Sequence, residues 1–396
     1  MHTLETLREY QEHYLRLFDT EYRRYLHQRV DFSLRLIGIV GARGVGKTTF
    51  LLQHLREHPL PLTKKLYFSA DDLDIDSLFD VAYAFAREGG ELLIIDEIHK
   101  YRHFEKELKK IYDMLPLRVI FSGSSALRLD HAQGDLSRRA MLYRMRGLSF
   151  REFVEIREGI TLPAYTREEI FTRHTEIARR LLKSIKPYAF WREYLDGGYY
   201  PFYFEDPAGY PLRLKQTINA VIEVDIPSIF PIEYEKILSL KKLVRLVCES
   251  PPFKINIKTL SEKMAIRDYQ TLYRYMEYLH RGSIQSLIRP RSRGDSIFVK
   301  PQKLYLANTN LHAAYCDSVE IGTLREVFFM SMMGEESLEV ASRGDFVVDG
   351  RYTVEIGGQG KGFDQIKDMP DAFVVADGIE VGFGHKIPLW LFGFLY

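Results

Sequence analysis

The chain has few cysteines and no long apolar run, and each absence narrows the class of protein. Its 396 residues include two cysteines, Cys248 and Cys316. They lie in unrelated contexts without metal-ligand spacing, so we expect reduced, buried thiols. No apolar run approaches the roughly 18 residues that indicate a membrane span, and the first residues lack the apolar core of a signal peptide. We therefore expect a cytoplasmic protein with no membrane partner.

Net charge is also nearly absent, at +1 for the whole chain, but this sum hides an asymmetry. Residues 1–234 are balanced, with 34 basic and 34 acidic side chains. Residues 235–310 carry 15 Lys and Arg against 6 Asp and Glu, whereas residues 311–396 carry 6 against 14. A basic segment between a neutral and an acidic one indicates separate modules with separate partners.

Strand patterns alternate with helical patterns in the first part of the chain. This alternation predicts the α/β class, with a parallel sheet sandwiched by helices. Leucines and aromatic residues at helical spacing in residues 1–28 predict an amphipathic helix that packs on this core. The expected strands are 34–40, 65–69, 92–96, 118–122 and 141–146, and the expected helices are 48–57, 76–87 and 104–114.

The first expected strand runs directly into a Gly-x-x-x-x-Gly-Lys-Thr motif, and a helical pattern follows it. A motif in this context predicts a Walker A phosphate loop, or P-loop, whose backbone N–H groups face phosphate oxygens. Lys47 is placed to hold the β- and γ-phosphates, and the Thr48 hydroxyl to bind Mg²⁺. We expect ATP and Mg²⁺ as cofactors. The expected nucleotide-binding residues are Gly41, Ala42, Arg43, Gly44, Val45, Gly46, Lys47, Thr48 and Thr49.

Two acids end the buried strand expected at 92–96, at the edge where α/β sheets bind their ligands. Asp96 is placed to bind Mg²⁺, and Glu97 to polarise the attacking water, as in a Walker B motif. A catalytic Glu directly after this Asp marks ATPases that have an additional strand between the two motifs. The strand expected at 65–69 fits that position.

Further polar residues follow the next strands. Ser122 or Ser124 can orient the attacking water beside the γ-phosphate, or serve as turn and helix-capping residues. Arg138 and Arg139 can reach the γ-phosphate of a neighbouring subunit as arginine fingers, which implies a homo-oligomer. Alternatively, these arginines form a surface pair or salt bridges with nearby acids.

The basic segment 235–310 shows three helical patterns, then β patterns at 284–288 and 296–299 around an arginine-rich turn. Three helices and a basic hairpin predict a winged helix-turn-helix. We expect it to bind DNA, although such modules also dock on proteins. The candidate contact residues are Arg267, Arg274, Arg291 and Arg293.

The acidic tail has patterns for a helix at 325–333 and strands at 345–348, 352–356, 372–376 and 388–394. Glu326, Asp345 and Glu355 follow the order of the metal-binding acids of a large nuclease superfamily. The motif lysine is replaced by Gly357, and Lys361 can substitute for it only if the intervening loop folds back. We expect the tail to be a structural or regulatory domain without nuclease activity.

These motifs together resemble a prokaryotic family of AAA+-superfamily ATPases. The family pairs the ATPase with a C-terminal domain of unknown function that contains a winged helix and a degenerate restriction-endonuclease-like fold. The likeness covers nearly the whole chain and implies AAA+-like nucleotide chemistry. It rests on the motifs at 41–48, 96–100, 121–125, 135–139, 147–152 and 387–390.

Three functions remain open on the sequence. The first is a Mg²⁺-dependent ATPase whose cycle moves a DNA-binding arm. The second is an assembly or signalling switch that ATP controls with little turnover, and the third is an ATPase-regulated nuclease. The expected domains are an N-terminal helix (1–28), a P-loop ATPase core (29–150), a helical lid (151–234), the winged helix-turn-helix (235–310) and the tail (311–396).

Overall fold

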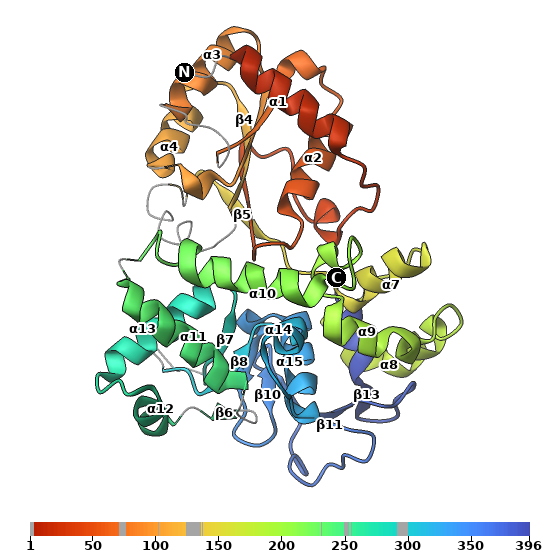
Figure 1. The fold of residues 1–396 in the computed structure, drawn as a ribbon. Coiled ribbons are helices and arrows are strands. Elements are labelled where there is room, and N and C mark those ends of the chain that lie inside the picture. The colour runs from red at the N-terminus through yellow and green to blue at the C-terminus, as the bar shows by residue number, and fades with distance from the viewer. Residues whose placement is uncertain are drawn as a thin grey trace. The chain divides into compact units, whose positions relative to one another are not determined.

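A five-stranded parallel sheet forms the centre of the first part of the computed structural model (Figure 1). The strand order is β2-β3-β4-β1-β5, and every residue of β1, β2 and β3 is buried, as in sheets covered on both faces. The strands are β1 (Leu36–Val40), β2 (Lys65–Ser69), β3 (Leu92–Asp96), β4 (Arg118–Gly123) and β5 (Met141–Arg144).

The structure describes residues 4–70, 77–101, 103–123, 136, 138–230, 232–248, 253–254, 256–290 and 300–396. The chain divides into two compact units, Met1–Gly147 and Leu148–Tyr396. Among the described residues, no helix has both the length and the apolar character that a membrane span requires.

Helices cover both faces of the sheet in the first unit, with α2 on one face and α3 and α4 on the other (Figure 1). The predicted α/β class and parallel sheet are confirmed here. The α-helices are α1 (Leu4–Leu17), α2 (Lys47–Glu57), α3 (Leu78–Arg87) and α4 (Phe104–Met114). Short 3-10 helices are η1 (Tyr25–Gln28), η2 (Leu62–Lys64) and η3 (Ile98–Lys100).

One expectation for this unit was wrong. The first helix ends at Leu17 instead of continuing through residue 28. The strand expected at 65–69, between the two motifs along the chain, does form as β2. In the sheet it lies at the edge, and the strand between β1 and β3 is β4. The order of the strands along the chain therefore differs from their order in the sheet, because β4 pairs with both β1 and β3.

Helix α1 protects the free edge of the sheet at β2. The side chain of Gln11 is 2% exposed, and its Oε1 accepts a hydrogen bond of 2.7 Å from the backbone N–H of Tyr67. This bond satisfies a donor that an edge strand otherwise leaves without a partner strand.

The second unit begins with helices and contains two sheets. Its first helices are α7 (Phe150–Glu158), α8 (Arg167–Leu181), α9 (Pro187–Gly197), η4 (Pro201–Tyr203), α10 (Tyr210–Ala220) and the π-helix η5 (Val221–Asp225). Helices α7 and α8 both start with a capping box, in which a hydroxyl and a glutamate satisfy the free N–H groups of the first turn.

Three helices and a three-stranded antiparallel sheet of order β6-β8-β7 follow. Side chains of Asn256 and Asp268 cap α12 and α13. The strand that pairs with β7 is 303–306, and the strand expected at 296–299 lies outside the described residues. The elements are α11 (Tyr234–Cys248), β6 (Phe253–Lys254), α12 (Ile257–Met264), α13 (Tyr269–Arg281), β7 (Gln285–Ile288) and β8 (Lys303–Leu306).

The tail is built on a five-stranded sheet of order β13-β12-β11-β10-β9, parallel from β11 to β13 and antiparallel from β9 to β11. The expected strand at 388–394 was wrong, because the chain turns into a 3-10 helix after Pro388. Its six apolar residues are all buried, and such a run does not distinguish a strand from a helical segment. The elements are α14 (Thr309–Tyr315), α15 (Ile321–Met333), η6 (Glu335–Ser337), β9 (Leu338–Val340), β10 (Phe346–Val348), β11 (Tyr352–Gly357), β12 (Ala372–Ala376), β13 (Lys386–Pro388) and η7 (Leu389–Phe394).

The expectation of two free thiols was also wrong. Cys248 at the end of α11 and Cys316 just after α14 form a disulfide, with their Cα atoms 5.2 Å apart. The two residues are 68 positions apart, and the packing of α11 on α14 brings them together. Two cysteines in unrelated local contexts carry no sign of such a contact.

The contact between α1 and β2 gives a test of the edge. We expect Gln11→Leu to destabilise the fold by about 1–3 kcal/mol, because the Tyr67 N–H loses its buried acceptor. The measurement is the midpoint of thermal unfolding of the full chain. Glu12→Leu, on the exposed side of the same helix, is the control and should leave the midpoint nearly unchanged. Equal midpoints for both variants would contradict this role of Gln11.

Candidate nucleotide and metal site

The loop between β1 and α2 can approach a ligand closely because its glycines carry no side chain. Gly44 and Gly46 have φ angles of 83° and 96°, which glycine adopts without strain. A Cβ atom on Gly41 would lie 2.3 Å from the backbone oxygen of Met145, so this position has no room for a side chain. Val45 is fully buried and fixes the loop on the core.

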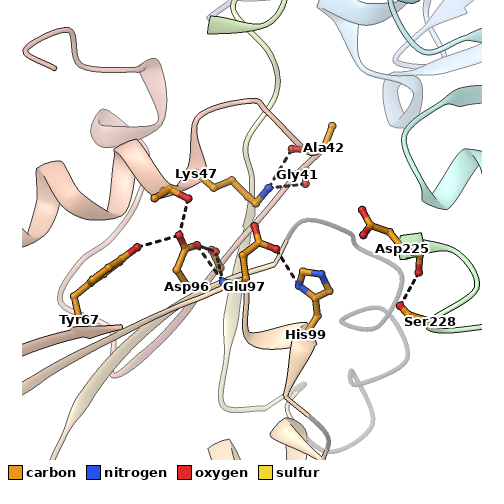
Figure 2. A network of polar contacts seen from close by, with 11 residues as sticks. Gly41, Ala42, Lys47, Tyr67, Asp96, Glu97, His99, Asp225 and Ser228 are labelled. Atoms are coloured by element: carbon orange, nitrogen blue, oxygen red, sulfur yellow. Dashed lines mark hydrogen bonds and ion pairs between the residues drawn. The ribbon is translucent and has the colours of Figure 1, made fainter. Parts of the chain in front are cut away.

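Lys47 is the first residue of α2, and its side chain folds back over the loop. It is 4% exposed, and its Nζ donates to the backbone oxygens of Gly41 at 3.2 Å and Ala42 at 3.1 Å. Figure 2 shows the ammonium group at the mouth of the loop. The helix N-terminus and this ammonium together favour an anion at this position.

Asp96 ends β3, and its buried carboxylate joins three strands and a helix. It is 2% exposed. Its Oδ2 accepts hydrogen bonds from Thr48 Oγ1 at 2.6 Å and from the Tyr67 hydroxyl at 3.2 Å (Figure 2). Its Oδ1 accepts from the Ser122 hydroxyl and, at 3.1 Å, from the backbone N–H of Glu97. The structure thus brings together the two predicted metal-binding residues, Thr48 and Asp96.

Glu97 follows in a backbone conformation that aims its side chain away from the strand. Its φ angle of 49° lies in the left-handed region, which costs a non-glycine residue about 1–3 kcal/mol. Its Oε2 lies 3.4 Å from Nδ1 of His99, which is almost fully buried (Figure 2). Strain of this kind is often retained where a side chain must point at a reacting group.

Ser122 is the last but one residue of β4, the strand beside β3. Its hydroxyl donates to Asp96 Oδ1 and accepts a hydrogen bond of 3.1 Å from the Glu97 N–H. The side chain is completely buried. Its hydroxyl therefore positions both the carboxylate of Asp96 and the backbone of Glu97. The alternative residue, Ser124, lies outside the described residues.

The two candidate arginine fingers differ in their surroundings. Arg139 forms a two-pronged salt bridge with Asp113, at 2.8 Å and 3.0 Å. Hydrogen bonding to Arg139 holds the pKa of the exposed Asp113 carboxyl below its ordinary value. Arg139 thus has the surface ion pair that was the alternative to a finger. Arg138 is exposed to solvent.

The candidate DNA-contacting residues lie in the second unit. Arg267 is exposed, just before α13. Arg274 on α13 donates to the Thr271 hydroxyl at 2.8 Å and lies 3.7 Å from the capping residue Asp268. Arg291 and Arg293 lie outside the described residues.

The sequence reasoning missed the residue that holds the P-loop from behind. Arg24 is 5% exposed, and its guanidinium donates to the backbone oxygens of Val45 at 2.6 Å and of both Arg146 and Gly147 at 2.8 Å. Arg24 therefore joins the phosphate loop to the chain that leaves β5. Only the tertiary fold brings these three carbonyls together, so no local pattern signals the contact.

Tyr67 and His99 were missed as well. The order Asp-Glu-x-His at 96–99 is a local signal for His99, since a short helical turn brings its ring back to Glu97. Tyr67 gives no such signal, because its contact with Asp96 depends on the pairing of β2 with β3.

A glycine loop, a lysine, a hydroxyl and two acids therefore converge at one end of a parallel sheet. This fold and site define a P-loop domain. Residues 33–154 also match a family model described as an AAA domain. The first unit is accordingly a P-loop domain of the AAA type. Residues 189–318 match a second model, described as a domain of unknown function.

One relative is an uncharacterized protein, MJ1637, of Methanocaldococcus jannaschii. It is 26% identical over an alignment of 284 residues, and the match covers 68% of this chain. The chain spans about 60% of the length of that relative.

Three solved structures show a distant likeness. The Walker-type ATPase PABY2304 of Pyrococcus abyssi is 13% identical, with a TM-score of 0.43 over 76% of this chain and 96% of that one. The S. cerevisiae Hsp104–ADP complex is 16% identical, with a TM-score of 0.34 over 70% and 42%. The AMPPCP-bound DnaA of Aquifex aeolicus is 14% identical, with a TM-score of 0.24 over 70% and 91%. Values this low establish no shared activity.

The contacts of Arg24 lead to a prediction about nucleotide affinity. We expect Arg24→Ala to weaken the binding of a fluorescent ATP analogue about tenfold, because hydrogen bonds from a charged group contribute roughly 1.5–3 kcal/mol each. Arg24→Lys should recover only part of the affinity, since one ammonium cannot reproduce the planar fork. Arg23→Ala removes an exposed neighbour that pairs with Glu57, and it serves as the control.

Proposed function

We propose that the chain binds ATP with Mg²⁺ and hydrolyses it. The observation that carries this proposal is the network in which Asp96 holds the hydroxyl of Thr48 while the neighbouring Glu97 keeps its carboxylate beside His99. A structure that only bound phosphate would not require an acid in a strained conformation next to the loop.

The oxygen donors of the site suit Mg²⁺. Thr48 Oγ1 and the Asp96 carboxylate are hard oxygen ligands 2.6 Å apart, and Mg²⁺ is usually bound by one or two such side chains together with substrate phosphates. When bound, the ion would neutralise charge on the β- and γ-phosphate oxygens. Thr48 and Asp96 would hold it.

The residues of the chain divide the remaining work. Lys47 would exchange the carbonyls of Gly41 and Ala42 for phosphate oxygens. Glu97 would orient a water molecule and take its proton as the water oxygen bonds to the γ-phosphorus and the bond to the bridging oxygen of ADP breaks. Ser122 would keep Glu97 in place through its backbone N–H.

We further propose that residues 235–310 bind DNA as a winged helix. Support comes from the net basic charge of this segment and from its element order, helix–strand–helix–helix–strand–strand. A winged helix places the third helix, here α13, in a groove. Arg267 stands at its start, exposed. In this proposal ATP turnover changes how the DNA is held.

A second copy of the chain could complete the site. The exposed guanidinium of Arg138 is the candidate for a finger that reaches a neighbour's γ-phosphate, whereas Arg139 is held by Asp113. The alternative function is a switch in which ATP sets the assembly state with little turnover. The position of Glu97 favours hydrolysis, because a switch has no need of a general base.

Two substitutions test the hydrolytic site. We expect Lys47→Ala to lose ATP binding and turnover together. Glu97→Gln should still bind ATP but release phosphate at least about 100-fold more slowly, since a positioned general base contributes 10²–10⁴-fold. Phosphate release and ATP-analogue binding are the measurements, and Glu12→Gln on the exposed side of α1 is the control. Full turnover in Glu97→Gln would refute the role of Glu97.

DNA binding has its own test. We expect the full chain to bind duplex DNA, and Arg267→Ala to weaken binding and reduce the slope of log affinity against log salt by about one unit. Arg173→Ala is the control, because this exposed arginine of α8 is paired with Glu176. No binding at low salt, or an unchanged slope in Arg267→Ala, would favour a protein partner for this module.

A further inference from the structure

Three acids of the tail come together in the second unit, as the nuclease-like order of the sequence predicts. Glu326 comes from α15, Asp345 precedes β10, and Glu355 lies on β11. Their side chains are largely buried, with exposed fractions of 9%, 19% and 3%. Buried carboxylates that lie close to one another destabilise the fold unless a cation or hydrogen bonds compensate their charges.

A lysine from the neighbouring three-stranded sheet lies between two of these acids. Lys303 on β8 places its Nζ 3.2 Å from Glu326 Oε2 and 3.4 Å from Asp345 Oδ1. The lysine is 5% exposed, and its ammonium lies 4.7 Å from the centre of the Phe346 ring. The charge is thus enclosed by the two carboxylates and an aromatic face.

Each of the two acids also accepts a hydrogen bond from a second donor. The Tyr305 hydroxyl donates to Glu326 Oε2 at 2.5 Å, and the backbone N–H of Ile356 donates to Asp345 Oδ2 at 2.8 Å. Burial and the neighbouring Asp345 raise the pKa of Glu326 above its ordinary value, and Lys303 opposes this rise. Both acids therefore already have a cation, the ammonium of Lys303, and a hydrogen-bond donor beside them.

The third acid has its own lysine. Lys361 forms an ion pair with Glu355 Oε1. A Cβ atom built on Gly357 would lie 2.7 Å from both Cβ and Cγ of Lys361, so the stem of Lys361 fills the space of a side chain at position 357. The loop between Gly357 and Lys361 does fold back, which was the condition for Lys361 to take the place of the motif lysine. Its ammonium neutralises the acid that would otherwise help to bind a metal.

These contacts do not fit the Mg²⁺ ion of the nuclease superfamily. A divalent ion needs several carboxylate oxygens that converge on one point and are free to bind it. Within the part of the chain that the structure describes, no group of three or more His, Cys, Asp or Glu residues is arranged to hold a metal ion.

We infer that the ammonium of Lys303 takes the position of the metal ion in this cluster, so the cluster is a closed ionic junction and no nuclease centre. The junction ties β8 of the three-stranded sheet to α15 and to the start of β10. It thereby holds the proposed DNA-binding module and the tail rigidly together. The inference does not depend on ATP hydrolysis or on DNA binding.

The test is Mn²⁺ binding to the full chain without nucleotide, followed by electron paramagnetic resonance of the free ion. We expect Asp345→Asn in the otherwise native chain to leave Mn²⁺ binding unchanged, because the cluster holds no metal. Lys303→Ala should gain about one bound Mn²⁺ and lose about 5–10 °C in the midpoint of thermal unfolding, since a buried acid pair is left without its cation. Mn²⁺ should restore much of this loss.

Two further variants separate the charge from the fold. Lys303→Ala combined with Asp345→Asn should lose the gained Mn²⁺, and Lys303→Arg should keep the native behaviour. The exposed Lys367→Ala is the matched control. If Lys303→Ala fails to fold, the comparison of Asp345→Asn with the native chain still decides the question.

Three results would overturn the inference. The first is a native chain that loses one bound Mn²⁺ on Asp345→Asn. The second is a native chain that cleaves DNA in a metal-dependent reaction abolished by Glu355→Gln, and the third is a folded Lys303→Ala variant that binds no additional Mn²⁺.

Discussion

The structure of the nucleotide site depends on one buried carboxylate, that of Asp96. A carboxylate removed from water must have its oxygens hydrogen-bonded, and here two donors face each oxygen. The donors are the hydroxyls of Thr48, Tyr67 and Ser122 and the backbone N–H of Glu97. The bonds that stabilise the buried acid thereby fix the start of α2, the middle of β2, the end of β4 and the acid proposed as the general base.

Asp96 and the pair of Glu326 and Asp345 are compensated in different ways, and this difference distinguishes a binding site from a structural junction. Asp96 is held by neutral hydroxyl and N–H donors within the described contacts, which leave its negative charge available to a cation. Glu326 and Asp345 instead share the ammonium of Lys303, which already occupies the position of a cation between them. Three acids in a familiar order therefore do not by themselves indicate metal chemistry. Whether such acids can bind a metal ion depends on the charge of the groups that already contact them.

The sequence predicted what is local and missed what depends on distant pairing. The strand, loop and helix around Lys47 and the strand that ends at Asp96 were predictable, because each is a short pattern with its own physical cause. The order of strands, the disulfide between Cys248 and Cys316, and the contacts of Arg24 arise from segments far apart in the chain. The segment after Pro388 was mispredicted because a fully buried apolar run has no periodicity to read.

The central claim is that the P-loop and the Asp96 network form one catalytic site for Mg²⁺ and ATP. The most direct test is steady-state phosphate release by the native chain and by Asp96→Asn, each titrated with Mg²⁺ at saturating ATP. The account predicts Mg²⁺-dependent turnover in the native chain and its loss in Asp96→Asn at every Mg²⁺ concentration. Turnover by Asp96→Asn at the native rate, or native turnover without a divalent ion, would contradict it.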